Sequence, residues 1–331
     1  MFFNSKNVFV TGGAGFIGST LVRELLKEGA NVTVYDNFLI GDNSNLDEVK
    51  DKIKILRGDI LDKNLKETLV NNEIDYVFNL AAEPYIPHCY DRPVRFFEIN
   101  ANGALNVLLA SKAANIKRIV QYSSSEVYGS AKYIPMDEEH PTLPLSTYAV
   151  SKLAADRLCF TLHHEQKIPV IILRQFNVYG PRETQPYVIP ELISQLNMHD
   201  TLHLGNITAR RDFTYVADAA KGAIELMKHE EAEGQVFNMG TGNDYSIEQI
   251  ANMVGELMGH ENIKISVDKN RLRPLDVQRL NCNNSKMQKL TGWKPTIEFK
   301  EGLKLTIEHF KECGGKWLWE TKIKEEEKMW K

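Results

Sequence analysis

The sequence predicts an α/β protein in which a doubly wound parallel sheet is joined to a smaller, interleaved domain. Two observations predict this fold. Short apolar runs alternate with helix-like segments through the first half of the 331-residue chain, as in parallel sheets with helices on both faces. A glycine-rich turn, Thr11–Gly18, follows the first apolar run and opens a helix, which is the setting in which such a turn binds phosphate.

The turn Thr11–Gly18 has the pattern of a dinucleotide-binding loop. The run Val8–Val10 before it is typical of a buried strand. Gly12, or the glycine after it, allows a tight turn, and Gly15 lets the backbone approach a diphosphate. Gly18 allows the helix to pack closely on the strand, and the helix N-terminus attracts the phosphate charge. An ordinary strand-to-helix turn that binds nothing is the alternative for this motif alone.

The second predicted strand, Asn31–Tyr35, indicates which dinucleotide is bound. It ends at Asp36, eighteen residues after Gly18, near the spacing of the acid that hydrogen-bonds an adenosine ribose. The run from Asn37 to Leu46 contains no Lys or Arg, whereas a 2′-phosphate would need a cation there. We therefore expect NAD rather than NADP, with a plain loop aspartate as the alternative.

Further apolar runs predict strands that end in polar or small residues. The runs 53–56, 76–80, 118–122 and 169–173 lead to Asp59, Ala81–Ala82, Ser123–Ser125 and Arg174, with helices expected at Asn102–Ala114 and Thr147–Glu165. Because ligands collect at the carboxyl ends of parallel strands, these terminal residues are the candidates for chemistry.

The second half of the chain predicts two lobes that interleave in sequence. Asn177–Pro190 is rich in Pro, Gly, Tyr and Arg and is typical of a functional loop. Val236–Met239 predicts a strand that returns to the sheet, and Ser246–Met258 a helix capped by Ser246. We expect a dinucleotide-binding domain at residues 1–174 with 211–241, and a second domain at 175–210 with 242–331. From Cys313 onward we expect a solvated or docked terminal helix.

Composition argues against several other classes of protein. A net charge of −4 and a pI near 6.2 give no basis for binding nucleic acid or an anionic membrane. No apolar run reaches the ~20 residues of a spanning helix. The four cysteines form no Cys-x-x-Cys pair, and the first predicted strand leaves no room for a signal peptide, so we expect a cytoplasmic protein. His163-His164-Glu165 do not converge on a helix, and we expect no metal site.

The segment Tyr148–Lys152 places a phenol and an ammonium four residues apart, on one face if it is helical. A lysine beside a tyrosine favours the phenolate and lowers its pKa toward the working pH. Such a tyrosine can take a proton from a sugar hydroxyl while a nicotinamide takes the hydride from the same carbon. An ordinary surface pair has the same spacing, but the glycine turn and Ser123–Ser125 favour catalysis.

Together these motifs resemble the extended short-chain dehydrogenase/reductase family, in its branch that modifies nucleotide sugars. The resemblance covers nearly the whole chain, through Thr11–Gly18, Asp36, Gly58–Asp59, Leu80–Ala82, Ser123–Gly129, Tyr148–Lys152, Phe176–Arg182 and Arg211–Phe213. It implies a Rossmann domain that binds NAD through Gly12, Gly15, Phe16, Ile17, Asp36, Asn37, Asp59, Ile60, Ala81, Ala82, Tyr148 and Lys152. It also implies that Ser124, Ser125, Glu126, Tyr148 and Lys152 are catalytic, and that Asn177, Arg211 and Arg273 hold the nucleotide diphosphate.

Glu126 bears on which reaction this resemblance implies. Simple 4-epimerases of the family usually carry a small residue there, whereas Glu is similar to nucleotide-sugar 4,6-dehydratases and to UDP-glucuronate decarboxylases. A dehydratase needs a base for the C5 proton, and Glu126 is the candidate. Ser125 stands where dTDP-glucose dehydratases carry Asp, although members that act on GDP-mannose also have Ser, so the general acid stays open. A carboxylate that only caps a loop is the structural alternative for Glu126.

The segment Arg271–Cys282 bears on which substrate the resemblance implies. Decarboxylases need a cation for the substrate carboxylate, and Arg279 lies in a region where they carry one. The whole segment is more similar to dehydratases that act on nucleotide-linked N-acetylhexosamines. The resemblance therefore implies a UDP-N-acetylglucosamine-type 4,6-dehydratase, a lyase, with a UDP-sugar 4-epimerase or a UDP-glucuronate-type decarboxylase as alternatives.

Two further expectations concern the state of the protein. A non-catalytic NAD-binding regulator is a remote alternative, because it would not need Ser124, Glu126, Tyr148 and Lys152 together. Similar proteins pair the helices that correspond to Asn102–Ala114 and Thr147–Glu165 in a four-helix interface, which implies a homodimer.

Overall fold

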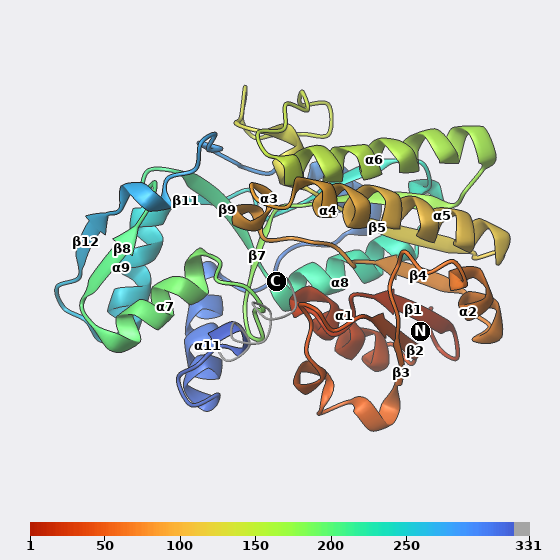
Figure 1. Cartoon of the computed structure of the whole chain (residues 1–331), viewed down its shortest axis with the longest axis horizontal. Coiled ribbons are helices and arrows are strands. Elements are labelled where there is room, and N and C mark those ends of the chain that lie inside the picture. The colour runs from red at the N-terminus through yellow and green to blue at the C-terminus, as the bar shows by residue number, and fades with distance from the viewer. Residues whose placement is uncertain (321–331) are drawn as a thin grey trace.

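The computed structural model describes residues 1–320, which form a larger and a smaller unit side by side (Figure 1). The larger unit is built on a seven-stranded sheet of order β10-β6-β5-β4-β1-β2-β3, and all of its neighbours are parallel. The strands are β1 (Asn7–Thr11), β2 (Asn31–Asp36), β3 (Lys54–Arg57), β4 (Tyr76–Asn79), β5 (Arg118–Ser124), β6 (Val170–Gln175) and β10 (Val236–Met239). The strand order reverses between β1 and β4, so the predicted doubly wound sheet is confirmed.

Helices cover both faces of this sheet (Figure 1). One face carries α1 (Phe16–Lys27), α8 (Val216–Met227) and α10 (Ser285–Thr291); the other carries α2 (Leu65–Asn71), α5 (Ala104–Ala113) and α6 (Thr147–Gln166). Successive strand side chains point to opposite faces, so Val8 and Val10 pack in the first core and Phe9 packs in the second. The strands are buried on both faces, which is why their sequences are nearly continuous apolar runs.

The helix expected at Asn102–Ala114 is α5, and the helical segments that lead directly into it begin earlier than predicted, at Pro93. The short α3 (Ile86–Cys89) is followed by α4 (Pro93–Phe97), and a π-helical segment, Glu98–Gly103, joins α4 to α5. The proline at the start of α4 fits there because the first helical amides have no partner within the helix. The helix expected at Thr147–Glu165 is α6, and the Ser146 hydroxyl caps it by accepting from the amide of Ala149.

The smaller unit packs three helices around its own core. They are α7 (Val188–Met198), α9 (Ile247–Met258) and α11 (Phe299–Glu312), beside the parallel pair β8 (Thr201–Leu204) and β12 (Lys264–Val267). The predicted cap of α9 is confirmed: Ser246 and Gln249 form a reciprocal capping box. Trp317 packs on Phe310 of α11, so the tail docks as far as residue 320. The rest of the expected terminal helix lies outside the described residues.

A three-stranded sheet of order β11-β9-β7 joins the two units. It contains β7 (Asn177–Tyr179), β9 (Arg210–Tyr215) and β11 (Asp244–Ser246). The domain boundary expected at residue 211 falls inside β9, which pairs with β7 and β11 rather than with the large sheet. The chain re-enters the larger unit at α8, and β10 then pairs with β6. None of the helices within residues 1–320 is long and apolar enough to cross a membrane.

Candidate active site

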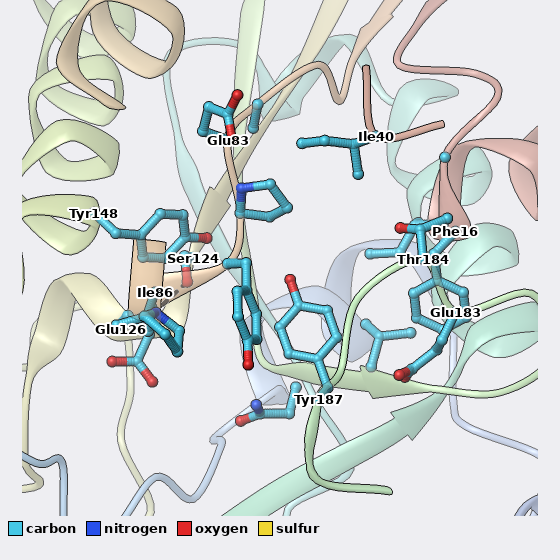
Figure 2. A pocket seen from close by; sticks show the side chains of 18 of the residues that line it. Phe16, Ile40, Glu83, Ile86, Ser124, Glu126, Tyr148, Glu183, Thr184 and Tyr187 are labelled. Atoms are coloured by element: carbon cyan, nitrogen blue, oxygen red, sulfur yellow. Dashed lines mark hydrogen bonds between the residues drawn. The ribbon is translucent and has the colours of Figure 1, made fainter. Parts of the chain in front are cut away.

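A cavity of about 750 Å³ lies over the carboxyl ends of the central strands and extends to the smaller unit. All residues predicted to bind or react line it: Gly12, Gly15, Phe16, Ile17, Asp36, Asn37, Asp59, Ile60, Ala81, Ala82, Ser124, Ser125, Glu126, Tyr148, Lys152, Asn177, Arg211 and Arg273. Figure 2 shows Ser124, Glu126 and Tyr148 on one side of this cavity and Phe16, Thr184 and Glu183 on the other. Within residues 1–320 no three His, Cys, Asp or Glu side chains gather as a metal site.

The N-terminus of α1 forms the part of the wall that suits a phosphate group. Gly15 precedes the helix in an extended conformation, and no side chain caps the first turn. Its unpaired amides and the helix dipole suit a diphosphate. Gly12 has a φ of +67°, and a Cβ there would lie 2.9 Å from the amide nitrogen of Ala81. A Cβ on Gly18 would collide with the Gly12 carbonyl, so the turn requires these two glycines.

Asp36 is fixed at the end of β2, where the adenosine ribose of a dinucleotide is expected. It is 6% exposed, and its two carboxylate oxygens accept from the amides of Ala14 at 2.9 Å and Phe38 at 2.8 Å. Each oxygen can accept a further bond. Asn37 donates to Asp59 at 2.9 Å, which joins two strand ends along the cavity. The uncapped helix and this carboxylate together fit NAD.

A short turn at the end of β5 directs Glu126 into the cavity. The Ser124 hydroxyl accepts from the amide of Glu126 at 3.2 Å and caps the 3₁₀ turn Ser125–Tyr128. Burial lowers the pKa of Arg211, and the negative charge of Glu126 counteracts this shift. Burial raises the pKa of Tyr148, and the charge of Glu126 raises it further. Glu126 is therefore close to both the phenol and the guanidinium. The same turn that follows the strand thus places a carboxylate in the cavity wall.

Tyr148 and Lys152 lie on one face of α6 and are both buried in the cavity wall. The pKa of Tyr148 differs from the expectation: burial raises it to about 12, Glu126 adds to this, and a hydrogen bond with Ser124 opposes it. Burial lowers the pKa of Lys152 to about 8. The Lys152 ammonium donates to the Tyr122 carbonyl at 2.5 Å. This bond holds the ammonium at the end of β5.

Comparison with known proteins identifies the group to which this site belongs. Residues 9–306 match the family described as GDP-mannose 4,6 dehydratase, and the match spans most of the chain. The protein belongs to this family. Its members are nucleotide-sugar enzymes of the extended short-chain dehydrogenase/reductase type, and the cofactor is NAD.

Relatives within the family catalyse three different reactions. A UDP-N-acetyl-α-D-glucosaminuronate decarboxylase of Bacillus cytotoxicus is 34% identical over 93% of this chain and 98% of its own. The structure of the dTDP-glucose 4,6-dehydratase DesIV of Streptomyces venezuelae with NAD has a TM-score of 0.87 at 28% identity, covering 94% and 99% of the two chains. A UDP-N-acetylglucosamine 4-epimerase of Methanobrevibacter ruminantium has a TM-score of 0.85 at 32% identity, covering 94% and 99%. Similarity therefore establishes the family but leaves the reaction open.

In this nucleotide-sugar enzyme, Asn100 links the helix of Tyr148 to the cavity loop, a role that the sequence did not indicate. The side-chain oxygen Oδ1 of Asn100 accepts from the backbone amide of Glu83 at 2.8 Å. Its side-chain nitrogen Nδ2 donates to the Ser151 hydroxyl at 2.9 Å. That hydroxyl donates to the Tyr148 carbonyl at 2.7 Å. Asn100 lies in the π-helical segment, and such segments are frequent at functional sites. A lone helical asparagine carries no sequence signal for this role.

The substrate end of the cavity gathers arginines and aromatic rings from distant segments. Arg211 is 7% exposed and lies 3.6 Å from Asp276, and Arg271 lies 2.9 Å from Glu191. The side-chain carbonyl of Asn177 is buried without a hydrogen-bond partner in the described residues. Further lining residues that the sequence did not single out are Tyr85, Tyr187, Glu183, Glu191, Arg271 and Asp276. The segments rich in Tyr and Arg were the only signal for them.

Arg279, the candidate cation for a decarboxylase, lies away from the cavity wall of residues 1–320. Its guanidinium is 2.5 Å from one oxygen of Asp244, and Arg210 is 2.6 Å from the other. Asp244 is buried between the two cations. The charge of Arg279 is therefore already paired at the junction of the two units.

Proposed function

We propose that this enzyme is a NAD-dependent nucleotide-sugar 4,6-dehydratase that acts on UDP-N-acetylglucosamine. The observation that carries the proposal is the position of Glu126, on the same side of the cavity as Ser124 and Tyr148 (Figure 2). An oxidation at C4 needs only the phenol and the hydroxyl. The additional carboxylate is the group that removal of a C5 proton requires.

The residues divide into two successive tasks. Tyr148 takes the proton of the C4 hydroxyl, assisted by Ser124, while the C4 hydrogen leaves as hydride. Glu126 then removes the C5 proton, which the new 4-keto group has made acidic, and the C6 hydroxyl takes up a proton and leaves as water. C5 regains a proton when the hydride returns at C6, so the sugar loses one water in total. Bound NAD supplies the hydride acceptor, a positive charge that lowers the pKa of a nearby phenol, and the hydride returned at C6.

The surroundings of Arg279 favour dehydration over decarboxylation. A substrate carboxylate would have to compete with Asp244 for this guanidinium, and Arg279 does not reach the cavity wall within the described residues. The Bacillus cytotoxicus relative is named for a UDP-linked sugar derived from N-acetylglucosamine. This supports a UDP-linked N-acetylhexosamine as the substrate, in agreement with the sequence of Arg271–Cys282.

A mass-spectrometric panel with purified protein tests the proposal. UDP-N-acetylglucosamine should give a product lighter by one water without net consumption of NAD. UDP-glucuronate should lose no carbon dioxide. A product of unchanged mass and altered sugar configuration would identify a 4-epimerase instead, and loss of carbon dioxide would identify a decarboxylase.

We also infer a homodimer in a reducing compartment such as the cytoplasm. Apolar side chains are exposed along α4, α5 and α6, among them Val94 at 70%, Phe97, Leu109 and Val150, and such a surface suits a helical interface. All four cysteines are free thiols. Light scattering at micromolar concentration should give twice the chain mass, and a monomer mass would contradict the interface.

A further inference from the structure

Glu183 is a buried carboxyl group in the cavity wall that neither the sequence nor the proposed reaction uses. It lies in the loop 181–187 between β7 and α7, lines the cavity and is 1% exposed. Its Oε2 atom has no hydrogen-bond partner among residues 1–320. Figure 2 shows Glu183, Thr184 and Phe16 on the same side of the cavity, opposite Tyr148. A buried carboxyl without a partner requires a physical explanation.

The nearest cation in sequence does not neutralise this carboxyl. Arg182 has a φ of +70°, a left-handed conformation that is uncommon outside glycine. Its guanidinium donates to both carboxylate oxygens of Glu48, at 3.0 and 3.2 Å. No ion pair reaches Glu183 within the described chain, and burial alone raises the pKa of its carboxyl well above the ordinary range. Burial therefore favours the neutral acid form of Glu183, and this form has one hydrogen to donate.

The ion pair of Arg182 attaches the loop to the phosphate-binding helix. Glu48 also accepts from Arg23 of α1 at 3.1 Å. Arg23 is in turn anchored by the Ser19 carbonyl, at 2.8 Å. We call Arg182, Glu48 and Arg23 the loop clamp. It joins the loop that carries Glu183 to the same helix whose first turn begins at Phe16.

We propose that Glu183 is a cofactor-binding residue that donates a hydrogen bond, as the neutral acid, to NAD near its diphosphate, while the loop clamp holds it in place. The loop clamp ties the loop of Glu183 to α1, and Glu183 lines the cavity on the same side as Phe16, where that helix begins and suits a diphosphate. An ionised carboxylate there would repel the phosphates, whereas a neutral acid can donate to them or to the adjoining ribose. This inference does not depend on which reaction follows.

Binding should then depend on pH in a defined direction. The pKa of Glu183 is raised already in the free protein, and a bond donated to the cofactor raises it further. Glu183 contributes no pH dependence to the dissociation constant for NAD while its carboxyl is neutral. Once the carboxyl ionises in the free protein, its contribution raises this constant by up to about tenfold per pH unit. The other ionisable groups around the loop are Arg23, Glu48, Tyr187, Tyr215, His309 and Cys313.

Calorimetric titration of NAD into the full chain, freed of nucleotide, tests the proposal between pH 6 and 9. Glu183→Gln keeps a neutral donor, so it should bind within about threefold of the parent at pH 6. It should lose the part of the pH dependence that Glu183 contributes and keep the part due to Lys152, whose pKa of about 8 lies in the same range. Glu183→Leu keeps the bulk but not the donor and should bind at least about fivefold more weakly at pH 6. UDP should bind all three proteins equally. Circular dichroism of each variant confirms folding.

The outcomes separate this role from a structural one. Parent-like NAD affinity in Glu183→Leu would overturn the proposal. Identical pH profiles for the parent and Glu183→Gln would also overturn it, and this comparison holds even if Glu183→Leu fails to fold. Weakened UDP binding with unchanged NAD binding would assign Glu183 to the substrate instead. Glu48→Gln should speed NAD dissociation several-fold, whereas Asp47→Asn, whose carboxylate pairs only with Lys50 among the described ion pairs, should not.

Discussion

The ammonium of Lys152 donates a hydrogen bond to the carbonyl oxygen of Tyr122 at 2.5 Å. This bond joins α6 to the end of β5, and it places the candidate catalytic lysine in a buried site where burial lowers its pKa to about 8. Between pH 8 and the ordinary lysine pKa, the folded protein binds fewer protons at this residue than the unfolded chain. Stability from this group must therefore rise with pH across that window.

Lys152→Met should reveal this contribution. Near pH 7 the charged lysine is a burden on the fold, so the variant should be more stable than the parent by up to ~3 kcal/mol. The difference should shrink as the pH rises from 8 toward 10.5. Urea unfolding of both proteins at several pH values measures it. A difference that stays constant with pH would mean that Lys152 is not the group that titrates.

Asp156 and Arg174 form a buried ion pair below the same strand ends. The guanidinium donates to the two carboxylate oxygens at 2.8 and 3.1 Å, and Ser123 donates to Asp156 at 3.0 Å. Asp156→Asn leaves the Arg174 charge uncompensated and should lower the free energy of unfolding by about 3–5 kcal/mol. Lys300→Ala removes an exposed pair with Glu256 and should change it by less than about 1 kcal/mol. Equal effects in urea titrations would contradict this ranking.

Two substitutions separate the halves of the proposed mechanism. Tyr148→Phe removes the base for the C4 proton, so adding substrate should produce no reduced nicotinamide. Glu126→Gln leaves Tyr148 in place, so reduced nicotinamide should form and elimination should slow by about 10²–10⁴. Absorbance of the reduced ring and deuterium uptake at C5 in heavy water follow the two steps. Turnover of Glu126→Gln at the parent rate would make Glu126 structural and favour a 4-epimerase.

Asp36→Arg tests the ribose contact. Loss of a charge-assisted pair should weaken NAD binding by roughly 2–3 kcal/mol, and the added cation should improve binding of NADP. Titration of both dinucleotides into the apo protein measures the change. Unchanged NAD affinity would place the ribose elsewhere than at Asp36.

Arg211 and Arg279 should behave differently in UDP binding. Arg211 is buried in the cavity wall, so Arg211→Ala should weaken UDP binding by about 1.5–3 kcal/mol. Arg279→Ala should leave the UDP affinity within about twofold of the parent, because Arg279 does not line the cavity of the described residues. It should lower the stability only, since Asp244 loses one of its two cations and keeps Arg210. Calorimetry with UDP decides between them. Loss of UDP affinity in Arg279→Ala would return Arg279 to the site and reopen the decarboxylase alternative.

The local patterns predicted the sheet well because each depends on few residues. The glycine turn, Asp36 at the end of β2 and the cap at Ser246 follow from neighbours in sequence. The pairing of β9, in which the expected boundary at residue 211 lies, did not follow from the sequence. Its partners are β7 and β11, and strand pairing is a long-range property. The irregular start of α5 was also missed, since a π-helical insertion leaves no periodic signal.

The sequence by itself determined which segments form the strands, where the dinucleotide turn lies and which residues stand at the strand ends. Those residues line one cavity because parallel strands present their carboxyl ends at one edge of the sheet. Only the tertiary structure decided the state of each group. Burial raises the pKa of Tyr148 and lowers that of Lys152, while Arg279 is paired with Asp244 and Glu183 has no partner for its Oε2 atom among residues 1–320. Charge and hydrogen bonding depend on what surrounds a side chain in space, and most of those neighbours are distant in the sequence.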